Sequence, residues 1–321
     1  MTQPTSALRV IIACAVSTLV ATACSAGASP SASPSAEAAS VSASPSSAAP
    51  SEALPVIDAG KIAFQSERDG NGEIYVAGTD GKQVNLTNNA AKDAQPTWSP
   101  DGTRIAFSSD RGGTFQIYVM NADGTGVQLV DDGKGMDGFP AWSPDGAHIA
   151  FASDRAGNAD VYVMNADGSG LVQLTTDPNN DLAPAWSPDS AQIAFDRDIG
   201  GSNFDIYVIN ADGTGETALA TDPAGDESPA WSPDGSKIAF FTDRDGNAEI
   251  YLMQPDGSGV VNITNDAGAD VLPAWSPDGT QLAFVSTRDG NEEIYEMEAD
   301  GSAVTRLTND PADDGEPAWS R

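Results

Sequence analysis

The 321-residue chain contains very little histidine, cysteine and positive charge. Its single histidine, His148, cannot build a His-rich metal site, and a Ser-His-Asp triad would have to use that one residue. The 15 Lys and Arg residues stand against 47 Asp and Glu residues, which gives a formal net charge of −32. Proteins bind nucleic acids mainly by neutralising phosphates with Lys and Arg, so this charge argues against nucleic acid and anionic lipid surfaces as partners.

Residues 1–23 have the pattern of an export signal, because Arg9 precedes an apolar run and three small residues stand directly before Cys24. This ending resembles a bacterial lipobox, and the resemblance implies that Cys24 is lipidated and anchors the protein to the outer face of the cytoplasmic membrane. The alternative is ordinary cleavage near this residue, followed by secretion. The second cysteine, Cys14, lies inside the apolar run, so the mature chain keeps at most one thiol and no internal disulfide is expected.

Residues 24–55 consist almost entirely of Ala, Ser and Pro. Such a segment has no bulky apolar groups to offset the entropy lost on ordering, so we expect a disordered tether. The folded domain is assigned to residues 56–321.

A repeat dominates the rest of the chain. The six tryptophans are spaced by 44, 44, 45, 44 and 44 residues, and similar text surrounds each one. A typical unit reads Pro-Ala-Trp-Ser-Pro-Asp-Gly, then Ile-Ala-Phe, Ser-Asp-Arg, Val-Tyr-Val, Asn-Ala-Asp-Gly and Leu-Thr. Its four apolar runs are rich in β-branched and aromatic residues and are separated by Gly-containing turns, which predicts a four-stranded antiparallel meander.

A sheet with two apolar faces must be covered on both sides, and identical neighbours in a ring do this. The sequence therefore predicts an all-β fold, a six-bladed β-propeller. The first unit begins at Lys61 with the second strand of a blade, and the chain ends with a first strand that runs from Pro317 to Arg321. We therefore expect the C-terminal strand to pair with the N-terminal blade and close the ring.

These motifs resemble the WD-like repeats of the TolB-type propellers, a bacterial cell-envelope family, over about residues 61–321. The resemblance implies a protein-interaction platform. The chain differs from TolB in that the tether replaces the N-terminal α/β domain.

One acidic position recurs in every unit, five residues before the Trp: Asp93, Asp137, Asp181, Asp226, Asp270 and Asp314. Because the Trp-containing strand is the innermost of a blade, we expect these carboxylates to ring the channel mouth. An Arg four residues after the Phe of the next strand should end on the same face: Arg68, Arg111, Arg155, Arg244 and Arg288. In one interpretation each Arg latches an Asp. In the other, the ring binds a hard cation such as Ca²⁺ or a cationic segment of a partner.

The unit that follows Trp186 departs from the pattern, because Ile199 occupies the Arg position. We therefore expect Asp181 to lack its latch. A preferred cation site would lie at Asp181 and Asp226, and neutral variation of a surface loop is the alternative.

Our leading functional prediction is an exported, lipid-anchored, monomeric and non-catalytic protein that presents its acidic channel mouth to an envelope protein or peptide. The alternative is a Ca²⁺-dependent, lactonase-like hydrolase, and a third possibility is a purely structural envelope component. A hydrolase needs different residues from different blades. The inner positions look nearly equivalent in the sequence, which favours binding.

Overall fold

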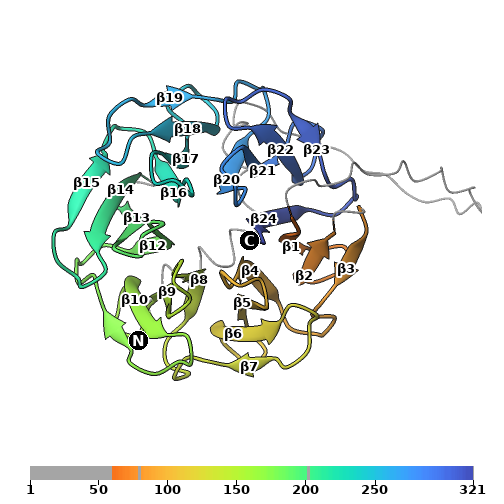
Figure 1. Cartoon of the computed structure of the whole chain (residues 1–321), viewed down its shortest axis with the longest axis vertical. Helices are drawn as coiled ribbons and strands as arrows, with labels where there is room; N and C mark the ends of the chain where they lie inside the picture. Colours follow the sequence, from red (N-terminus) through yellow and green to blue (C-terminus); the bar gives the residue numbers. More distant parts are fainter. Residues whose placement is uncertain (1–59, 79–80, 201–202, 321) are drawn as a thin grey trace, which may run out of the picture.

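The computed structural model describes residues 60–78, 81–200 and 203–320. Figure 1 shows these residues as a ring of β-sheets around a central axis. The predicted export signal (residues 1–23), the tether (residues 24–55) and Cys24 lie outside the described residues. Within the part that is described, no helix has the length and apolar character needed to cross a bilayer.

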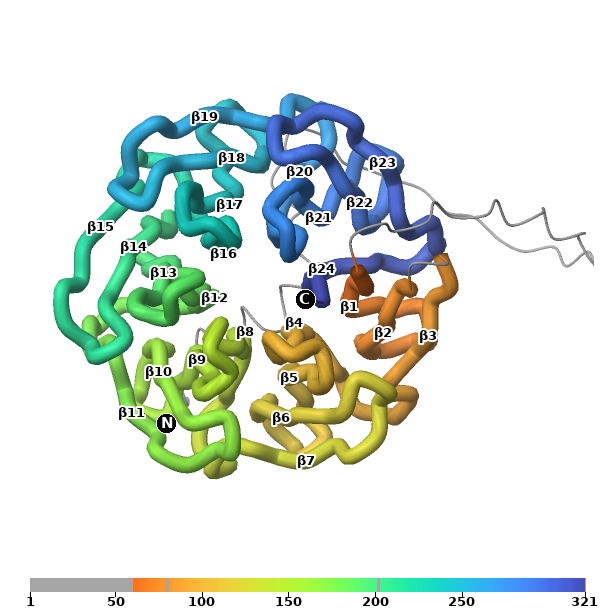
Figure 2. The backbone as a smooth tube through the Cα atoms, viewed as in Figure 1, coloured from red at the N-terminus to blue at the C-terminus, as the bar shows by residue number. Residues whose placement is uncertain are grey.

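Six four-stranded antiparallel sheets, here called blades, make up the ring. Each blade runs from a strand beside the channel to a strand at the circumference (Figure 2). This confirms the predicted six-bladed β-propeller. The innermost strands are β4 (Asp93–Trp98), β8 (Asp137–Trp142), β12 (Asp181–Trp186), β16 (Asp226–Trp231), β20 (Asp270–Trp275) and β24 (Asp314–Trp319).

The other three strands of each blade follow outward in chain order. The second strands are β1 (Ile62–Ser66), β5 (Arg104–Ser109), β9 (His148–Ser153), β13 (Gln192–Asp198), β17 (Ile238–Thr242) and β21 (Gln281–Ser286). The third strands are β2 (Glu73–Ala77), β6 (Gln116–Asn121), β10 (Asp160–Asn165), β14 (Phe204–Asn210), β18 (Glu249–Met253) and β22 (Glu293–Glu298). The outermost strands are β3 (Gln83–Asn85), β7 (Gln128–Leu129), β11 (Val172–Gln173), β15 (Thr217–Ala220), β19 (Val261–Asn262) and β23 (Thr305–Arg306).

The two ends of the described chain meet in one blade, here called the closing blade. Its strand order is β24-β1-β2-β3, with Ile62 opposite Trp319 and Ser66 opposite Asp314. The Ser320 N–H donates to the Lys61 carbonyl at 2.7 Å and extends the pairing beyond the strands. The predicted closure by the C-terminal strand is therefore confirmed.

The hydrophobic core lies between successive blades. Ile74 and Val76 of the closing blade pack in one cluster with Trp98 and Phe107 of the next blade, and Trp98 is only 6 % exposed. The Phe of each second strand is fully buried: Phe64, Phe107, Phe151, Phe195, Phe240 and Phe284. Burying a side chain of this size contributes about 1.5–3 kcal/mol, so each contact between blades stabilises the whole ring.

Turns at one end of the channel follow from the Ser-Pro-Asp-Gly text. Gly102 adopts a φ of 66° and donates its N–H to the Ser99 carbonyl at 2.8 Å. Asp101 accepts hydrogen bonds from the Ser99 hydroxyl and from the Thr103 N–H and hydroxyl, and these bonds lower its pKa to about 2. The turn thus fixes the link between the first and second strands.

Candidate functional site

Every innermost strand contains one residue with positive φ, two positions after its first Asp and directly before a Pro. The φ values range from 45° at Ala183 to 56° at Gln95 and Phe139. The register of each innermost strand with its neighbour is interrupted around this residue, as between Ala94 and Thr97. We call the six positions the hub residues: Gln95, Phe139, Ala183, Ser228, Leu272 and Glu316. A left-handed conformation is costly for a residue with a Cβ, so the fold stores strain at this ring.

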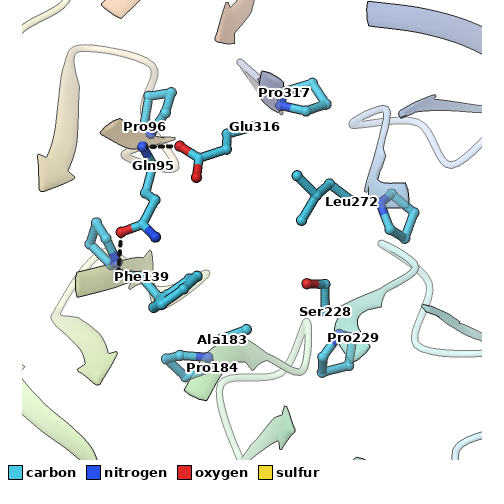
Figure 3. Close-up of a pocket in the computed structure, with 12 residues that line it drawn as sticks. Gln95, Pro96, Phe139, Ala183, Pro184, Ser228, Pro229, Leu272, Glu316 and Pro317 are labelled. Atoms are coloured by element: carbon cyan, nitrogen blue, oxygen red, sulfur yellow. Dashed lines mark hydrogen bonds between the residues drawn. The ribbon is translucent and has the colours of Figure 1, made fainter. Parts of the chain in front are cut away.

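The hub residues and the prolines that follow them line a cavity of about 170 Å³ in the channel. Figure 3 shows their side chains around its opening. The six side chains are all different in kind. Gln95, Ser228 and Glu316 are polar, while Phe139, Ala183 and Leu272 are apolar. The expectation of nearly equivalent inner positions is therefore wrong, because the repeat conserves the backbone shape at the hub and varies the side chain.

Hydrogen bonds link hub residues of neighbouring blades. The backbone N–H of Gln95 donates to the Glu316 carboxylate, and the Phe139 N–H donates to the side-chain oxygen of Gln95 at 2.8 Å (Figure 3). On the other side of the ring, the Ser228 N–H donates to the carboxylate of Asp196 at 3.0 Å. These bonds satisfy backbone donors that the bulged strands leave without ladder partners.

Several acidic groups beside the channel hold their protons unusually tightly. Burial raises the pKa of Glu316 to about 8, and burial with the nearby charge of Asp196 raises that of Glu227 to about 8. Burial also raises the pKa of Asp196 to about 7, and its Oδ1 has no hydrogen-bond partner. Removing a carboxylate from water disfavours its charged form, which explains the direction of all three shifts.

The six aspartates predicted to ring the channel mouth begin the innermost strands, but their side chains are fully buried. They do not line the channel cavity, whose only carboxylate among the described lining residues is that of Glu316. The expectation of an acidic ring open to solvent is corrected on this point. The reason is that a side chain at the start of the strand turns into its own blade, whereas the bulge two positions later points into the channel.

Each of these aspartates forms an ion pair with an arginine. Arg68 reaches Asp314 across the closing blade at 2.6 Å, Arg111 reaches Asp93 at 2.8 Å and Arg155 reaches Asp137 at 2.7 Å. Arg244 lies 2.7 Å from Asp226, and Arg288 lies 2.9 Å from Asp270. The guanidinium groups also lie over the Tyr ring of the third strand, as Arg68 does over Tyr75 at 4.5 Å. This geometry corresponds to the latch interpretation.

Asp181 does not lack a latch, contrary to the prediction. Arg197 supplies it, with Nε 2.6 Å from one carboxylate oxygen and Nη2 3.0 Å from the other. Arg197 stands opposite Asp181 in the ladder, where other blades carry Ser or Thr. Its guanidinium lies 4.5 Å from the centre of the Tyr207 ring. The Arg has thus moved two positions along the strand and kept its partners.

The expected calcium position at Asp181 and Asp226 also does not agree with the geometry. Both carboxylates are fully buried and are already paired with Arg197 and Arg244. Among the described residues, no group of three or more His, Cys, Asp or Glu side chains is arranged to hold a metal ion.

The hub residues were not predicted, because the prediction used residues that recur in every unit and the hub residue differs in each. Their signal is nevertheless present: each stands directly before the Pro of the Pro-Ala-Trp text or its variants. The hub position varies in chemistry, while the Pro directly after it and the Asp two positions before it are the same in every unit.

Solved structures with a similar fold include TolB proteins. TolB from Acinetobacter baumannii has a TM-score of 0.72 and 23% identity, with 81% of this chain and 66% of that chain covered. A protein assigned as TolB from Agrobacterium tumefaciens has a TM-score of 0.65 and 26% identity, with 78% and 88% covered. The present chain therefore spans slightly less than two thirds of the Acinetobacter protein.

Enzymes share the fold as well. A puromycin-hydrolyzing peptidase of Mycobacterium tuberculosis has a TM-score of 0.58 and 20% identity, with 80% of this chain and 44% of that chain covered. Identity at this level shows a common fold and nothing about activity. Comparison with curated proteins finds no match.

The sequence matches the family described as TolB beta propeller domain over residues 35–133, 125–203, 183–269 and 261–321. Together with the six-bladed ring and its closing blade, this shows that the chain belongs to the TolB beta-propeller family.

Proposed function

We propose that this protein is an exported, lipid-anchored and non-catalytic binding protein, whose channel mouth holds a protein or peptide of the cell envelope. The TolB-like propeller fold supports a role as a protein-binding scaffold. The export signal and Cys24 in the sequence support the location, and the Ala-, Ser- and Pro-rich tether would hold the propeller away from the membrane.

The observation that carries the proposal is the chemistry of the hub. Six different side chains on a closed ring give an uneven wall, in which the polar Gln95 and Glu316 lie side by side and Ser228 lies between the apolar Ala183 and Leu272. Ligand sites typically combine apolar lining with a few fixed polar groups, and this wall has that composition. Such a wall can orient a ligand, which a ring of six identical carboxylates could not.

The wall chemistry also favours binding over hydrolysis. The candidate nucleophile Ser228 and the candidate acid–base group Glu316 belong to β16 and β24, which are separated by the blade of β20. General-base activation of a Ser requires direct hydrogen-bond contact with its hydroxyl, and the bond between Ser228 and Asp196 involves only the Ser228 backbone N–H.

The proposal is tested by photo-crosslinking in intact cells. A photoreactive phenylalanine analogue is placed at Phe139 in the hub and, as the matched control, at Leu129 on the circumference. We expect the same envelope polypeptide to be captured from position 139 and not from position 129. Equal capture from both positions, or hydrolysis of an ester, lactone or glycoside panel by the purified metal-replete protein, would contradict the proposal.

A further inference from the structure

Glu316 is the hub residue that brings a carboxylate to the cavity. It is half-buried, and one carboxylate oxygen accepts the Gln95 N–H. Among the described residues its other oxygen has no hydrogen-bond partner, and no ion pair involves Glu316. Figure 3 shows that second oxygen directed toward the open channel. A carboxylate in this position gains most from a cationic donor that replaces the water it has lost.

Gln95 supplies a second free group next to Glu316. Its side-chain oxygen accepts hydrogen bonds from the Phe139 N–H and the Ser108 hydroxyl, both at 2.8 Å. These two donors fix the orientation of the amide, so the nitrogen Nε2 must face away from them. Gln95 is only 7 % exposed, and Nε2 has no hydrogen-bond partner. An unpaired buried donor costs about 1–3 kcal/mol, and a ligand carbonyl would remove that cost.

Apolar hub residues flank this pair on both sides of the ring. Phe139 and Ala183 follow Gln95 around the ring, and Leu272 precedes Glu316. Aliphatic carbons attached to a cation can therefore contact apolar side chains while the charged end reaches Glu316.

The type of cation follows from the single free oxygen. A guanidinium group binds best to two carboxylate oxygens at once, and one oxygen of Glu316 is already held by Gln95. An ammonium group is a compact donor that needs only one.

We propose that the channel mouth binds a primary ammonium group of an extended peptide at Glu316, with an adjacent peptide carbonyl on Gln95 Nε2 and the aliphatic carbons against Phe139 and Leu272. This inference rests on the proposed function and names the chemistry of its partner. The ammonium group can come from a Lys side chain or from a peptide N-terminus.

The test is a nuclear magnetic resonance titration of the full-length protein, with the side-chain amide of Gln95 as the reporter. The probes are acetyl-Ala-Leu-Lys-Leu-Ala-amide, the same peptide with acetyl-lysine or with arginine in place of lysine, and a norleucine peptide with a free N-terminus. We expect the lysine peptide, the free N-terminal peptide or both to bind at least about tenfold more tightly than the acetyl-lysine peptide, with arginine weaker than lysine.

Two variants identify the carboxylate. Glu316→Gln keeps an acceptor for the Gln95 N–H and removes the charge, so the preference for the ammonium group should disappear. Glu227→Gln removes a carboxylate that does not line the cavity and should keep the preference within about twofold. Because Glu316 must release its proton to bind a cation, and Lys stays charged over this range, affinity of the native protein for the lysine peptide should rise between pH 6.5 and pH 8.5.

Equal binding of the lysine and acetyl-lysine peptides, absence of binding, or an undiminished preference in Glu316→Gln would overturn the inference. An unchanged amide spectrum away from the channel shows that the variant is folded. These failures leave the crosslinking result from position 139 intact, so the inference can fail while the proposed function stands.

Discussion

Arg197 stands two residues before the position at which the other blades carry their arginine, yet it meets the same partners. It pairs with Asp181, lies over Tyr207 and is only 4 % exposed. Its Nη1 also reaches Glu216 at 2.7 Å, which adds a second carboxylate. Each blade needs a guanidinium group next to the buried Asp that begins its innermost strand. An Arg at either of two positions, two residues apart, can supply this group.

The latch can be tested at this blade. Arg197→Ala should lower the free energy of unfolding by about 3 kcal/mol or more, because it leaves Asp181 charged and buried without a partner. The measurement is urea unfolding followed by tryptophan fluorescence.

The matched control moves the arginine to the position used elsewhere. Arg197→Ser combined with Ile199→Arg should recover most of the lost stability. Lys134→Ala, which removes an ion pair whose Lys side chain is 75% exposed, should change stability by less than about 1 kcal/mol. A loss in Arg197→Ala no larger than that of Lys134→Ala would refute the latch.

The raised pKa values beside the channel predict a pH dependence. The folded chain binds protons to Glu316, Glu227 and Asp196 at pH values where the unfolded chain has released them. Their contribution is therefore complete below the unfolded pKa values near 4 and is lost as pH rises through about 7 to 8. The melting temperature should rise when pH is lowered from 8.5 to 6.

Calorimetric scans across this range provide the measurement. Glu316→Gln cannot titrate, so it should flatten part of the slope and melt higher than the native protein at pH 8.5. A melting temperature that stays constant or falls from pH 8.5 to 6 in the native protein would contradict the raised pKa values of these carboxylates.

At the scale of one strand, the bulge before each Pro determines what the channel presents. Ala183 holds a φ of 45° although it has a Cβ. Proline disfavours the right-handed α region for the residue before it. That residue forms a bulge in the innermost strand, and its side chain lines the channel cavity. The bulge recurs in all six innermost strands, so the ring of hub residues is a property of the repeat and not of one blade.

Strain at the bulge can be measured with glycine. Ala183→Gly should leave the free energy of unfolding unchanged or raise it by up to about 1 kcal/mol, because relief of the left-handed strain offsets the entropy of glycine. Ala141→Gly in the regular part of β8 should lower it by about 1 kcal/mol or more. Urea unfolding of both variants tests this, and an equal loss in the two would argue against strain at position 183.

The repeat made the strands predictable, but it gave no indication of the hub residues. Constant Trp, Asp and Phe positions report on packing between blades, so they predicted the blades and the closure. Gln95 and Glu316 could not be found in the same way, because each unit carries a different residue at this position and the repeat therefore gives no recurring signal there. The repeat does not reveal Arg197 as the partner of Asp181, because Arg197 does not stand at the position that carries Arg in the other units. It takes that role because it lies opposite Asp181 in the ladder of hydrogen-bonded strands.

The ring as a whole depends on a strand that the chain supplies last. β24 contributes Trp319 to the core and Asp314 to the pair with Arg68, and it forms the inner edge of the closing blade. Contacts between chain segments so far apart are formed late and are lost together.

Deletion of residues 314–321 should therefore unfold the propeller cooperatively. We expect loss of the near-ultraviolet circular dichroism of the tryptophans at 25 °C, without a stable partial ring. The control is a permuted chain in which residues 314–320 precede Lys61. That chain keeps the closing blade but loses its covalent link to β23, so it should fold with reduced stability. A truncated protein with a native spectrum would show that the ring does not need its closing strand.

One left-handed position in each innermost strand places its side chain at the cavity where the proposed ligand would bind. The tryptophans, latches and ladders lie elsewhere in each unit, so Phe139, Ala183, Ser228 and Leu272 can be exchanged with little disturbance of the blades, whereas Gln95 and Glu316 also hold the hub backbone in place. Propellers of this kind could acquire new ligands during evolution by exchanging single residues at the hub. A laboratory library randomised at those positions should yield folded proteins that bind other ligands.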